Sequence, residues 1–209
     1  VAVLPSLRAS GLGLIDAEAP GAGVERIAPR VVETAKKFWY VYLSLTVFIA
    51  LALFLFGMGP FDAVSHALTT ASTGGFSTKD SSLGHWNSIK IEMVVMLGFL
   101  LAAINFTLHA RSIEKKRFNY ASDSEFKSFM GLIAVGVLII TLLLNLEGFS
   151  FGTALRNASF NVVTLATSGG YGNALGRGES GDFASWPGST QLLLLFFIVI
   201  GGCTGATSG

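Results

Sequence analysis

The fold of this chain is decided by an uninterrupted apolar stretch, FWYVYLSLTVFIALALFLF, which occupies residues 38–56. It contains no charged side chain. A helix that crosses a bilayer core about 30 Å thick needs roughly 20 apolar residues. The stretch is therefore predicted to be a membrane-spanning helix, and Trp39 and Tyr40 at its start are typical of side chains at the membrane interface.

The composition of the whole chain agrees with a membrane protein. Hydrophobic residues make up 51% of its 209 residues, and charged residues only 13%, about half the share of an ordinary soluble domain. A net charge of +1 leaves no basic excess for binding nucleic acid, and the apolar content excludes a disordered chain. The single cysteine excludes a disulfide framework and a multi-cysteine metal site.

Three further apolar stretches are expected to span the membrane, near residues 88–110, 128–147 and 188–201. Glu92 and Glu147 lie at the ends of these stretches and are expected at the membrane interface. The last stretch is unusual, because its apolar part ends at Ile200 and the small residues GGCTGATSG follow at 201–209.

The charged connectors predict the orientation of the spans. Lysine and arginine are concentrated in two connectors: Arg26, Arg30, Lys36 and Lys37 in the first, and Arg111, Lys115, Lys116, Arg117 and Lys127 in the second. Cytoplasmic connectors carry such an excess, so both are expected inside the cell. The chain is thus predicted to be an all-α, multi-pass membrane protein. It begins with Val1 and is expected to be a fragment of a longer protein.

Two loops that are both expected outside the cell are similar in sequence and form an internal repeat. TTASTGGFST at residues 69–78 aligns without a gap with TLATSGGYGN at residues 164–173, an offset of 95 residues from Gly75 to Gly170. A short apolar segment precedes each loop, at 60–72 and at 152–167. These segments are too short to cross the membrane and are predicted to be re-entrant helices, which are tolerated where they line water or pack within protein. Such a repeat indicates a symmetric bundle around an axis.

The two loops have the chemistry of a cation filter. A dehydrated K⁺ needs a cage of oxygen atoms, which potassium channels build from the backbone carbonyls of Thr-Val-Gly-Tyr-Gly. Here SGGYG at 168–172 matches that pattern, and TGGFS at 73–77 is a looser copy. The predicted filter residues are Thr73, Gly74, Gly75, Ser168, Gly169 and Gly170, with K⁺ bound at Thr73, Gly74, Ser168 and Gly169. Phe76 and Tyr171 are expected to support the filter.

At this point the sequence resembles the Trk/Ktr/HKT superfamily of potassium transporters, and within it most closely the TrkH family. The resemblance is carried by HALTTASTGGFSTKDSSLG at 66–84, SFNVVTLATSGGYGN at 159–173 and IGGCTGATSG at 200–209. It implies repeated span–pore-helix–span units around a central pore, as in potassium channels. Residues 1–37 would be the tail of a preceding repeat and a cytosolic connector, 38–125 one pore repeat, and 126–209 the next repeat, cut short.

The resemblance also implies function and partners. The expected function is K⁺ uptake across the cytoplasmic membrane, with no enzymatic activity and no cofactor besides the transported K⁺. A homodimer in the lipid bilayer and a cytosolic nucleotide-binding regulatory subunit are the implied partners. The broken inner helix would form an intramembrane gating loop that includes Gly201, Gly202, Thr204, Gly205 and Gly209.

Several alternatives stay open from the sequence. A secondary transporter with broken helices could carry another small cation or solute, although no charge lies in the middle of the expected spans. The glycines after Ile200 could instead serve close packing of an unbroken helix. Asn105 and His109 share a helix face and could line a pore or, as we expect, contact a neighbouring helix. Whether transport is passive or a symport with H⁺ or Na⁺ is not visible in the sequence.

Overall fold

The computed structural model describes residues 24–115 and 120–207, and side chains over 32–113 and 120–207. The described part of the chain is helical and contains no strand. It divides into two compact units, residues 1–44 and residues 45–209. The boundary falls inside the helix α2, Val24–Leu55, which covers all but the last residue of the predicted span at 38–56. In the first unit the rings of Trp39 and Tyr40 contact each other edge to face, and both are exposed.

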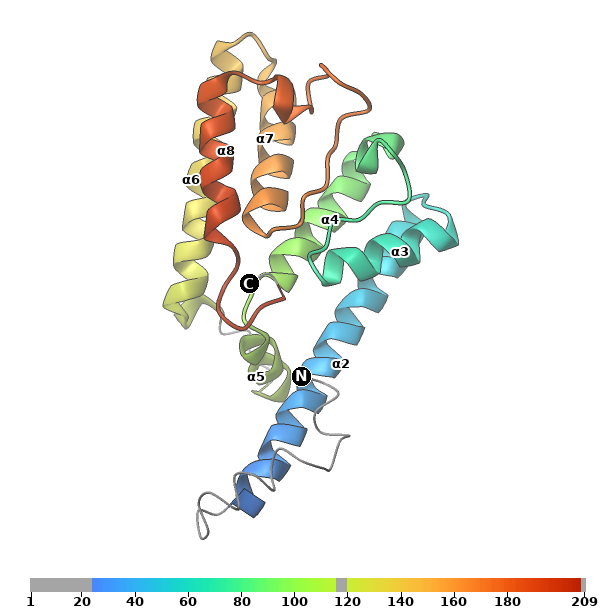
Figure 1. Ribbon diagram of the computed structural model, residues 1–209, viewed down its shortest axis with the longest axis vertical. Helices are drawn as coiled ribbons and strands as arrows, with labels where there is room; N and C mark the ends of the chain where they lie inside the picture. Colours follow the sequence, from blue (N-terminus) through green and yellow to red (C-terminus); the bar gives the residue numbers. More distant parts are fainter. Residues whose placement is uncertain (1–23, 116–119, 208–209) are drawn as a thin grey trace. The chain divides into compact units, whose positions relative to one another are not determined.

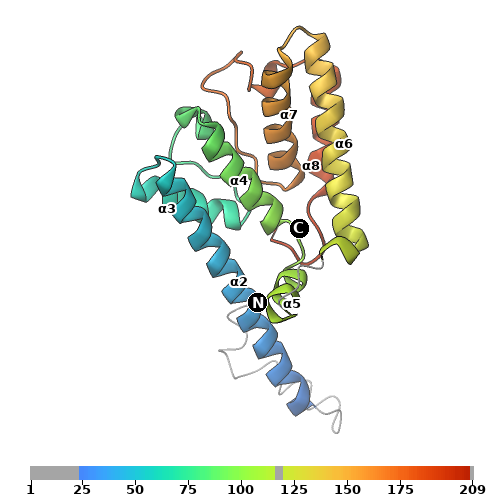
Figure 2. The same ribbon diagram turned by 180° about the vertical axis from the view of Figure 1, so that it is seen from behind.

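The second unit contains the remaining helices (Figure 1). In chain order they are α3 (Pro60–Ala71), the 3₁₀ turn η1 (Ser82–Trp86), α4 (Ile89–Ala102), α5 (Phe106–Lys115), η2 (Tyr120–Ser122), α6 (Ser124–Leu146), α7 (Phe151–Ala166), η3 (Phe183–Ser185) and α8 (Gly188–Ile200). Within this unit α7 packs against α6, α8 and α4, and α3 packs against α4, as Figures 1 and 2 show from opposite sides. The all-helical fold class expected from the sequence is confirmed.

Among the described residues, two helices are long and apolar enough to cross a membrane, Val32–Leu55 and Ser124–Leu146, as the sequence predicts. The side of α6 away from its helical neighbours carries exposed apolar residues such as Leu138 and Leu142. On the inner side, Gly136 lies so close to the ring of Phe197 that a Cβ atom there would overlap it. Small residues at such contacts let membrane helices approach closely.

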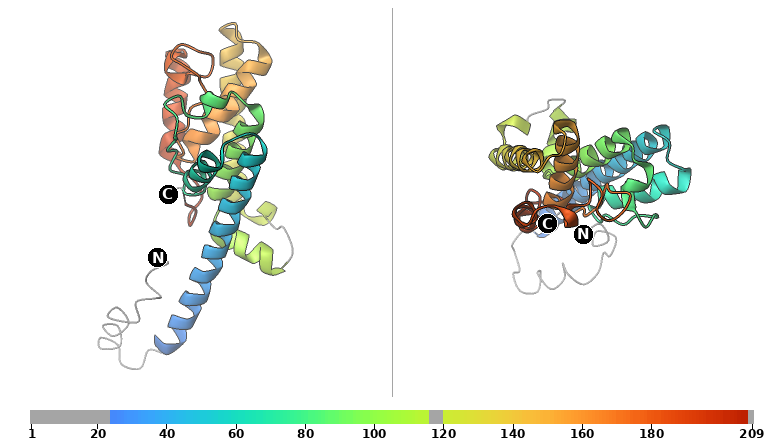
Figure 3. Two further views of the ribbon diagram at one scale, coloured as in Figure 1. Left: turned by 90° about the vertical axis from the view of Figure 1, so that its right-hand side faces the viewer. Right: turned by 90° about the horizontal axis from the view of Figure 1, so that it is seen from above.

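The expected span near 88–110 is not one continuous helix, although its two pieces together are long and apolar enough to form one broken span. The helix α4 ends at Ala102, and α5 starts at Phe106 after a bend of 93°. Figure 3 shows α5 leaving the end of α4 sideways. The start of α5 after the break is capped locally, because Asn105 Oδ1 accepts a hydrogen bond from the backbone N–H of Thr107 at 2.8 Å.

The side chains near this break explain the role of His109. Its ring bonds the carbonyl oxygen of Leu101 at 2.8 Å, across the bend, and the hydroxyl of Tyr120 at 3.0 Å. His109 therefore holds neighbouring segments together, whereas the side chain of Asn105 caps α5. This agrees with the helix-contact interpretation rather than with a pore-lining pair.

Glu92, expected at the membrane interface, lies in the first turn of α4 and is almost fully buried within the protein, between α4 and α7. Its side chain is only 1% exposed and forms two bonds with the guanidinium of Arg156, at 2.7 and 2.9 Å. Arg156 also donates to Oδ1 of Asn87 at 2.9 Å. A buried carboxylate is tolerated only when it is paired and hydrogen-bonded, and this bidentate geometry provides both.

Candidate functional site

Each predicted re-entrant segment is a helix whose carboxyl end leads directly into a glycine-rich loop. Pro60 occupies the first turn of α3, and Ser150 caps α7 by accepting from the N–H of Thr153. Both starts follow the usual preferences of helix N-termini. The negative ends of the helix dipoles are therefore directed at the loops.

The two loops have the same backbone conformation. Thr73 and Ser168 have φ values of 54° and 59°, and Gly75 and Gly170 have 66° and 74°. The N–H of Gly74 bonds the carbonyl of Thr69, and the N–H of Gly169 bonds that of Thr164, both at 2.7 Å. The repeat seen in the sequence is thus also a repeat of structure.

The carbonyl groups of the predicted filter are unpaired. Within the part of the chain that the structure describes, no hydrogen bond is accepted by the backbone carbonyls of Thr73, Gly74, Gly75, Ser168, Gly169 and Gly170. In an extended strand successive carbonyls point in alternating directions. Positive φ at every second residue of these loops breaks that alternation. Unpaired carbonyls at membrane depth require water or a cation as a partner.

The glycines of the two loops approach each other closely. A Cβ atom added at Gly75 would overlap the carbonyl oxygen of Gly169, and one added at Gly169 would overlap the ring of Phe99. At Gly170 the space within the described part of the chain is open. Glycine is favoured at 170 by its positive φ, a conformation that costs other residues about 1–2 kcal/mol.

The two predicted supporting aromatics differ. Tyr171 is 1% exposed, and its ring stacks on His66 at 5.6 Å and lies 5.4 Å from Phe99. Its hydroxyl hydrogen-bonds Thr69, so the second loop is fixed against α3. Phe76, the equivalent residue of the first loop, is 76% exposed. The structure therefore brings Tyr171, but not Phe76, into a supporting contact.

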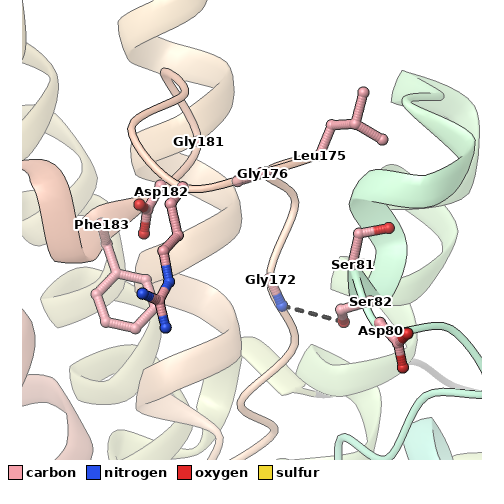
Figure 4. Close-up of a pocket in the computed structure, with 11 residues that line it drawn as sticks. Asp80, Ser81, Ser82, Gly172, Leu175, Gly176, Gly181, Asp182 and Phe183 are labelled. Atoms are coloured by element: carbon pink, nitrogen blue, oxygen red, sulfur yellow. Dashed lines mark hydrogen bonds between the residues drawn. The ribbon is translucent and has the colours of Figure 1, made fainter.

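An open cavity of about 410 Å³ lies next to the predicted filter loops, between the loop that follows α3 and the loop that follows α7. It is lined by Asp80, Ser81 and Ser82 on one side and by residues between Gly172 and Phe183 on the other (Figure 4). The N–H of Gly172 donates to Ser82 Oγ at 3.2 Å, and its carbonyl accepts from the N–H of Leu83 at 3.0 Å. Both polar groups of Gly172 therefore face the first outer loop.

The predicted gating segment is non-helical over its described residues, because α8 ends at Ile200 and Gly201 has a φ of 69°. Gly202, Thr204 and Gly205 lie in this irregular segment, whereas Gly209 lies outside the described residues. The interpretation of the glycines as part of an unbroken helix is therefore excluded for residues 201–207.

This segment pairs with the break between α4 and α5, which the sequence did not reveal. The N–H groups of Cys203 and Thr207 donate to the carbonyls of Ala103 and Ala102, at 2.8 and 3.1 Å, and Gly205 accepts from the N–H of Phe106 at 3.1 Å. The break after α4 and the segment after α8 thus supply hydrogen-bond partners for each other's backbone groups, which have no partner within a helix. The only signal in the sequence was Asn105, an N-cap type of residue inside an apolar stretch.

One side chain holds the segment from the first turn of α6. Glu125 Oε1 accepts from both the N–H and the hydroxyl of Thr204, at 2.7 and 2.8 Å. A carboxylate that accepts two hydrogen bonds holds its partner more firmly than a neutral acceptor does. The segment is therefore tethered both to the break and to the start of α6.

Comparison with known proteins agrees with this geometry. The sequence model of a family described as "TrkH: Cation transport protein" matches residues 2–209. The chain belongs to the TrkH family of cation transport proteins. Family membership places it among transport proteins rather than enzymes, and together with its apolar helices it identifies a multi-pass protein of the inner membrane.

Individual TrkH relatives are similar over the whole chain. It is 39% identical to the Trk system potassium uptake protein TrkH of Vibrio parahaemolyticus and 37% identical to that of Escherichia coli strain K12, covering 100% of this chain and 43% of each relative. The crystal structure of the potassium transporter TrkH from Vibrio parahaemolyticus superimposes with a TM-score of 0.80 at 36% identity, over 100% of this chain and 42% of that one. The chain thus spans less than half the length of these relatives.

Proposed function

We propose that the chain forms part of the pore of a potassium uptake protein, in which the loops at 73–75 and 168–170 are two sides of a selectivity filter. One observation carries the proposal: two loops in equivalent positions present unpaired carbonyls with the same alternating φ. Six such oxygens supply part of the cage that replaces the hydration shell of K⁺. Relatives that are named potassium uptake proteins support K⁺ as the ion.

The irregular segment at 201–207 is proposed as a movable constriction on the cytoplasmic side of the filter. Its bonds to Ala102, Ala103 and Glu125 hold it in one position without the rigidity of a helix. Breaking these bonds would free the segment to move. Movement of such a loop would control flux, while ion preference would remain with the filter.

The expected partners also remain proposals. A homodimer and a cytosolic nucleotide-binding regulatory subunit are implied by the resemblance to the superfamily. The basic connector leads into α6, whose first turn carries both Lys127 and Glu125, the residue that holds Thr204. A regulator that binds this connector could therefore act on the constriction through α6.

The alternative of a secondary transporter draws on one observation, the two helix breaks, which such proteins also have. Its ion-coupling sites usually contain charged groups inside the membrane. The buried Glu92 is neutralised by Arg156 near the start of α4, an arrangement that serves packing. We therefore favour the filter.

The test is ion flux through the full-length protein in proteoliposomes, with K⁺, Rb⁺ and Na⁺ compared. A filter predicts that K⁺ and Rb⁺ pass far better than Na⁺. Uptake of an organic solute, or equal passage of the three cations, would contradict the proposal. Repeating the measurement with and without a pH or Na⁺ gradient distinguishes passive flux from symport.

A further inference from the structure

Each filter loop is joined to the outer part of its own pore helix by a side-chain hydrogen bond at the same place in the repeat. In the first loop, the hydroxyl of Thr78 donates to Asp62 Oδ1 at 2.6 Å. In the second, Nδ2 of Asn173 donates to Asn157 Oδ1 at 3.1 Å. The partners are 16 residues apart in both cases, and the offset that relates Gly75 to Gly170 also relates the two pairs.

A second side chain, one helical turn further along, repeats as well. The ring of His66 donates from Nδ1 to the carbonyl of Asp62 at 2.7 Å, and Asn161 donates from Nδ2 to the carbonyl of Asn157 at 2.9 Å. Both residues also reach the loop. His66 Nε2 bonds the hydroxyl of Ser77 at 2.9 Å, and Asn161 bonds Asn173 Oδ1 at 3.3 Å.

The two networks differ in chemistry. The first is charged and near solvent, since Lys79 pairs with Asp62 at 3.3 Å and Thr78 is exposed. The hydrogen bond from Thr78 is the main reason why the pKa of Asp62 lies below its usual value. The second network is neutral and buried, with Asn157 only 4% exposed. An amide suits the buried position because it has no charge to desolvate.

These hydrogen bonds lie at the outer end of each loop, where they can fix its backbone. The inner end of each loop is already fixed by the pore helix, through the N–H groups of Gly74 and Gly169. Glycines between the two ends leave the backbone free to change conformation. Carbonyls can hold the spacing that distinguishes K⁺ from Na⁺ only if the outer end of the loop is fixed too, because the geometry of a binding site is kept in place by the contacts around it.

We propose that Asp62–Thr78 and Asn157–Asn173 are equivalent filter braces, positioning pairs that set ion selectivity by fixing the outer end of each loop. The inference rests on the proposed function of the loops as a K⁺ filter. Neither pair touches the ion. Each acts through the backbone that carries the unpaired carbonyls.

The experiment measures K⁺ and Na⁺ flux of the full-length protein in proteoliposomes. Thr78→Val and Asn173→Ala each remove one brace. Losing one hydrogen bond of about 1 kcal/mol should raise the Na⁺ to K⁺ flux ratio about three- to tenfold. Glu179→Gln, at an exposed acidic residue of the outer loop, is the matched control and should leave the ratio unchanged.

The repeat also suggests a rescue. The double variant Asp62→Asn with Thr78→Asn rebuilds the first brace with the chemistry of the second, so its flux ratio should return toward that of the wild type. A residue with only a structural role would change the melting temperature but not the ratio. Asn173 is buried, so if Asn173→Ala fails to fold, the exposed Thr78→Val and its rescue decide the question.

Gly170→Ser separates the failure of the braces from failure of the filter. If Gly170→Ser changes the flux ratio while folded Thr78→Val and Asn173→Ala do not, the braces are overturned and the filter stands. If all three leave the ratio at the wild-type value, the filter itself is refuted. If Thr78→Val changes the ratio and the double variant does not restore it, bracing by this hydrogen bond is also overturned.

Discussion

Thr73 and Ser168 have backbone angles that L-residues rarely adopt, with φ near 54° and 59°. Such conformations cost about 1–2 kcal/mol each, and they persist only where the surroundings enforce them. Here the enforcing contacts are hydrogen bonds to the last turns of α3 and α7, from the N–H groups of Thr73 and Ser168 themselves and of the glycines that follow. Strain of this kind concentrates at functional sites, which agrees with the placement of the filter in these loops.

At this scale, Gly170→Ser should reduce K⁺ over Na⁺ selectivity, whereas Gly178→Ser should not. Both glycines have positive φ, 74° and 78°, and both have open space where a Cβ atom would lie. Their backbone strain on substitution is therefore matched, and only their location differs. Flux of K⁺ and Na⁺ through both variants checks the prediction, and equal effects would contradict the assignment of the filter.

The buried ion pair predicts an asymmetry between its two partners. Arg156→Met should lower the melting temperature in detergent more than Glu92→Gln does. Removing the arginine leaves a carboxylate only 1% exposed without its partner, a change that costs about 3–5 kcal/mol. Removing the carboxylate leaves Arg156, whose side chain is 29% exposed, able to reach water. Equal losses would contradict the burial of Glu92.

At the scale of elements, the break after α4 and the irregular segment after α8 contact each other. The sharp bend after α4 leaves the carbonyls of Ala102 and Ala103 free, and the segment after α8 pairs with them. Either break alone would leave unpaired backbone groups inside the membrane. The bend and the irregular segment therefore depend on each other.

This dependence leads to a prediction about flux. Glu125→Ala, or deletion of part of 203–206, should raise K⁺ flux because each change releases the proposed constriction. The two hydrogen bonds to Glu125 are exposed to solvent and together contribute about 1–2 kcal/mol, so an increase of about tenfold is expected for Glu125→Ala. Glu147→Ala, at an exposed residue just after the other end of α6, is the control and should leave flux unchanged.

The ratio of K⁺ to Na⁺ flux should stay the same in these constriction variants, because the filter lies elsewhere. Folded variants with wild-type flux would count against a gate at 201–207. A loss of selectivity would instead indicate that this segment shapes the filter.

At the scale of the whole molecule, the orientation in the membrane can be tested by labelling. In a Cys203→Ser background, a cysteine introduced at Lys127 should react with an impermeant reagent only from the cytoplasmic side. A cysteine introduced at Glu179 should react only from outside. The expectation follows from the excess of lysine and arginine in the connector that includes Arg111 and Lys127. The opposite pattern would overturn the orientation and place the filter on the wrong side.

Much of the architecture was determined by the sequence alone. Hydropathy over 38–56 and 128–147 predicts the two long helices, since an apolar segment of about 20 residues has the length of a helix that crosses a bilayer. The repeated glycine pattern predicted two pore helices, and α3 and α7 lie within one residue of the expected 60–72 and 152–167. These features depend on local composition and on spacing along the chain, which are visible without a structure.

The tertiary structure alone decided how distant residues meet. Apolar content predicted a continuous span at 88–110, yet the helix bends because its freed carbonyls find partners about a hundred residues away, at Cys203 and Thr207. The burial of Glu92 likewise depends on Arg156 from another repeat. Hydropathy reports the affinity of a segment for lipid, but a helix break or a buried charge is stable only when another part of the chain supplies its hydrogen bonds.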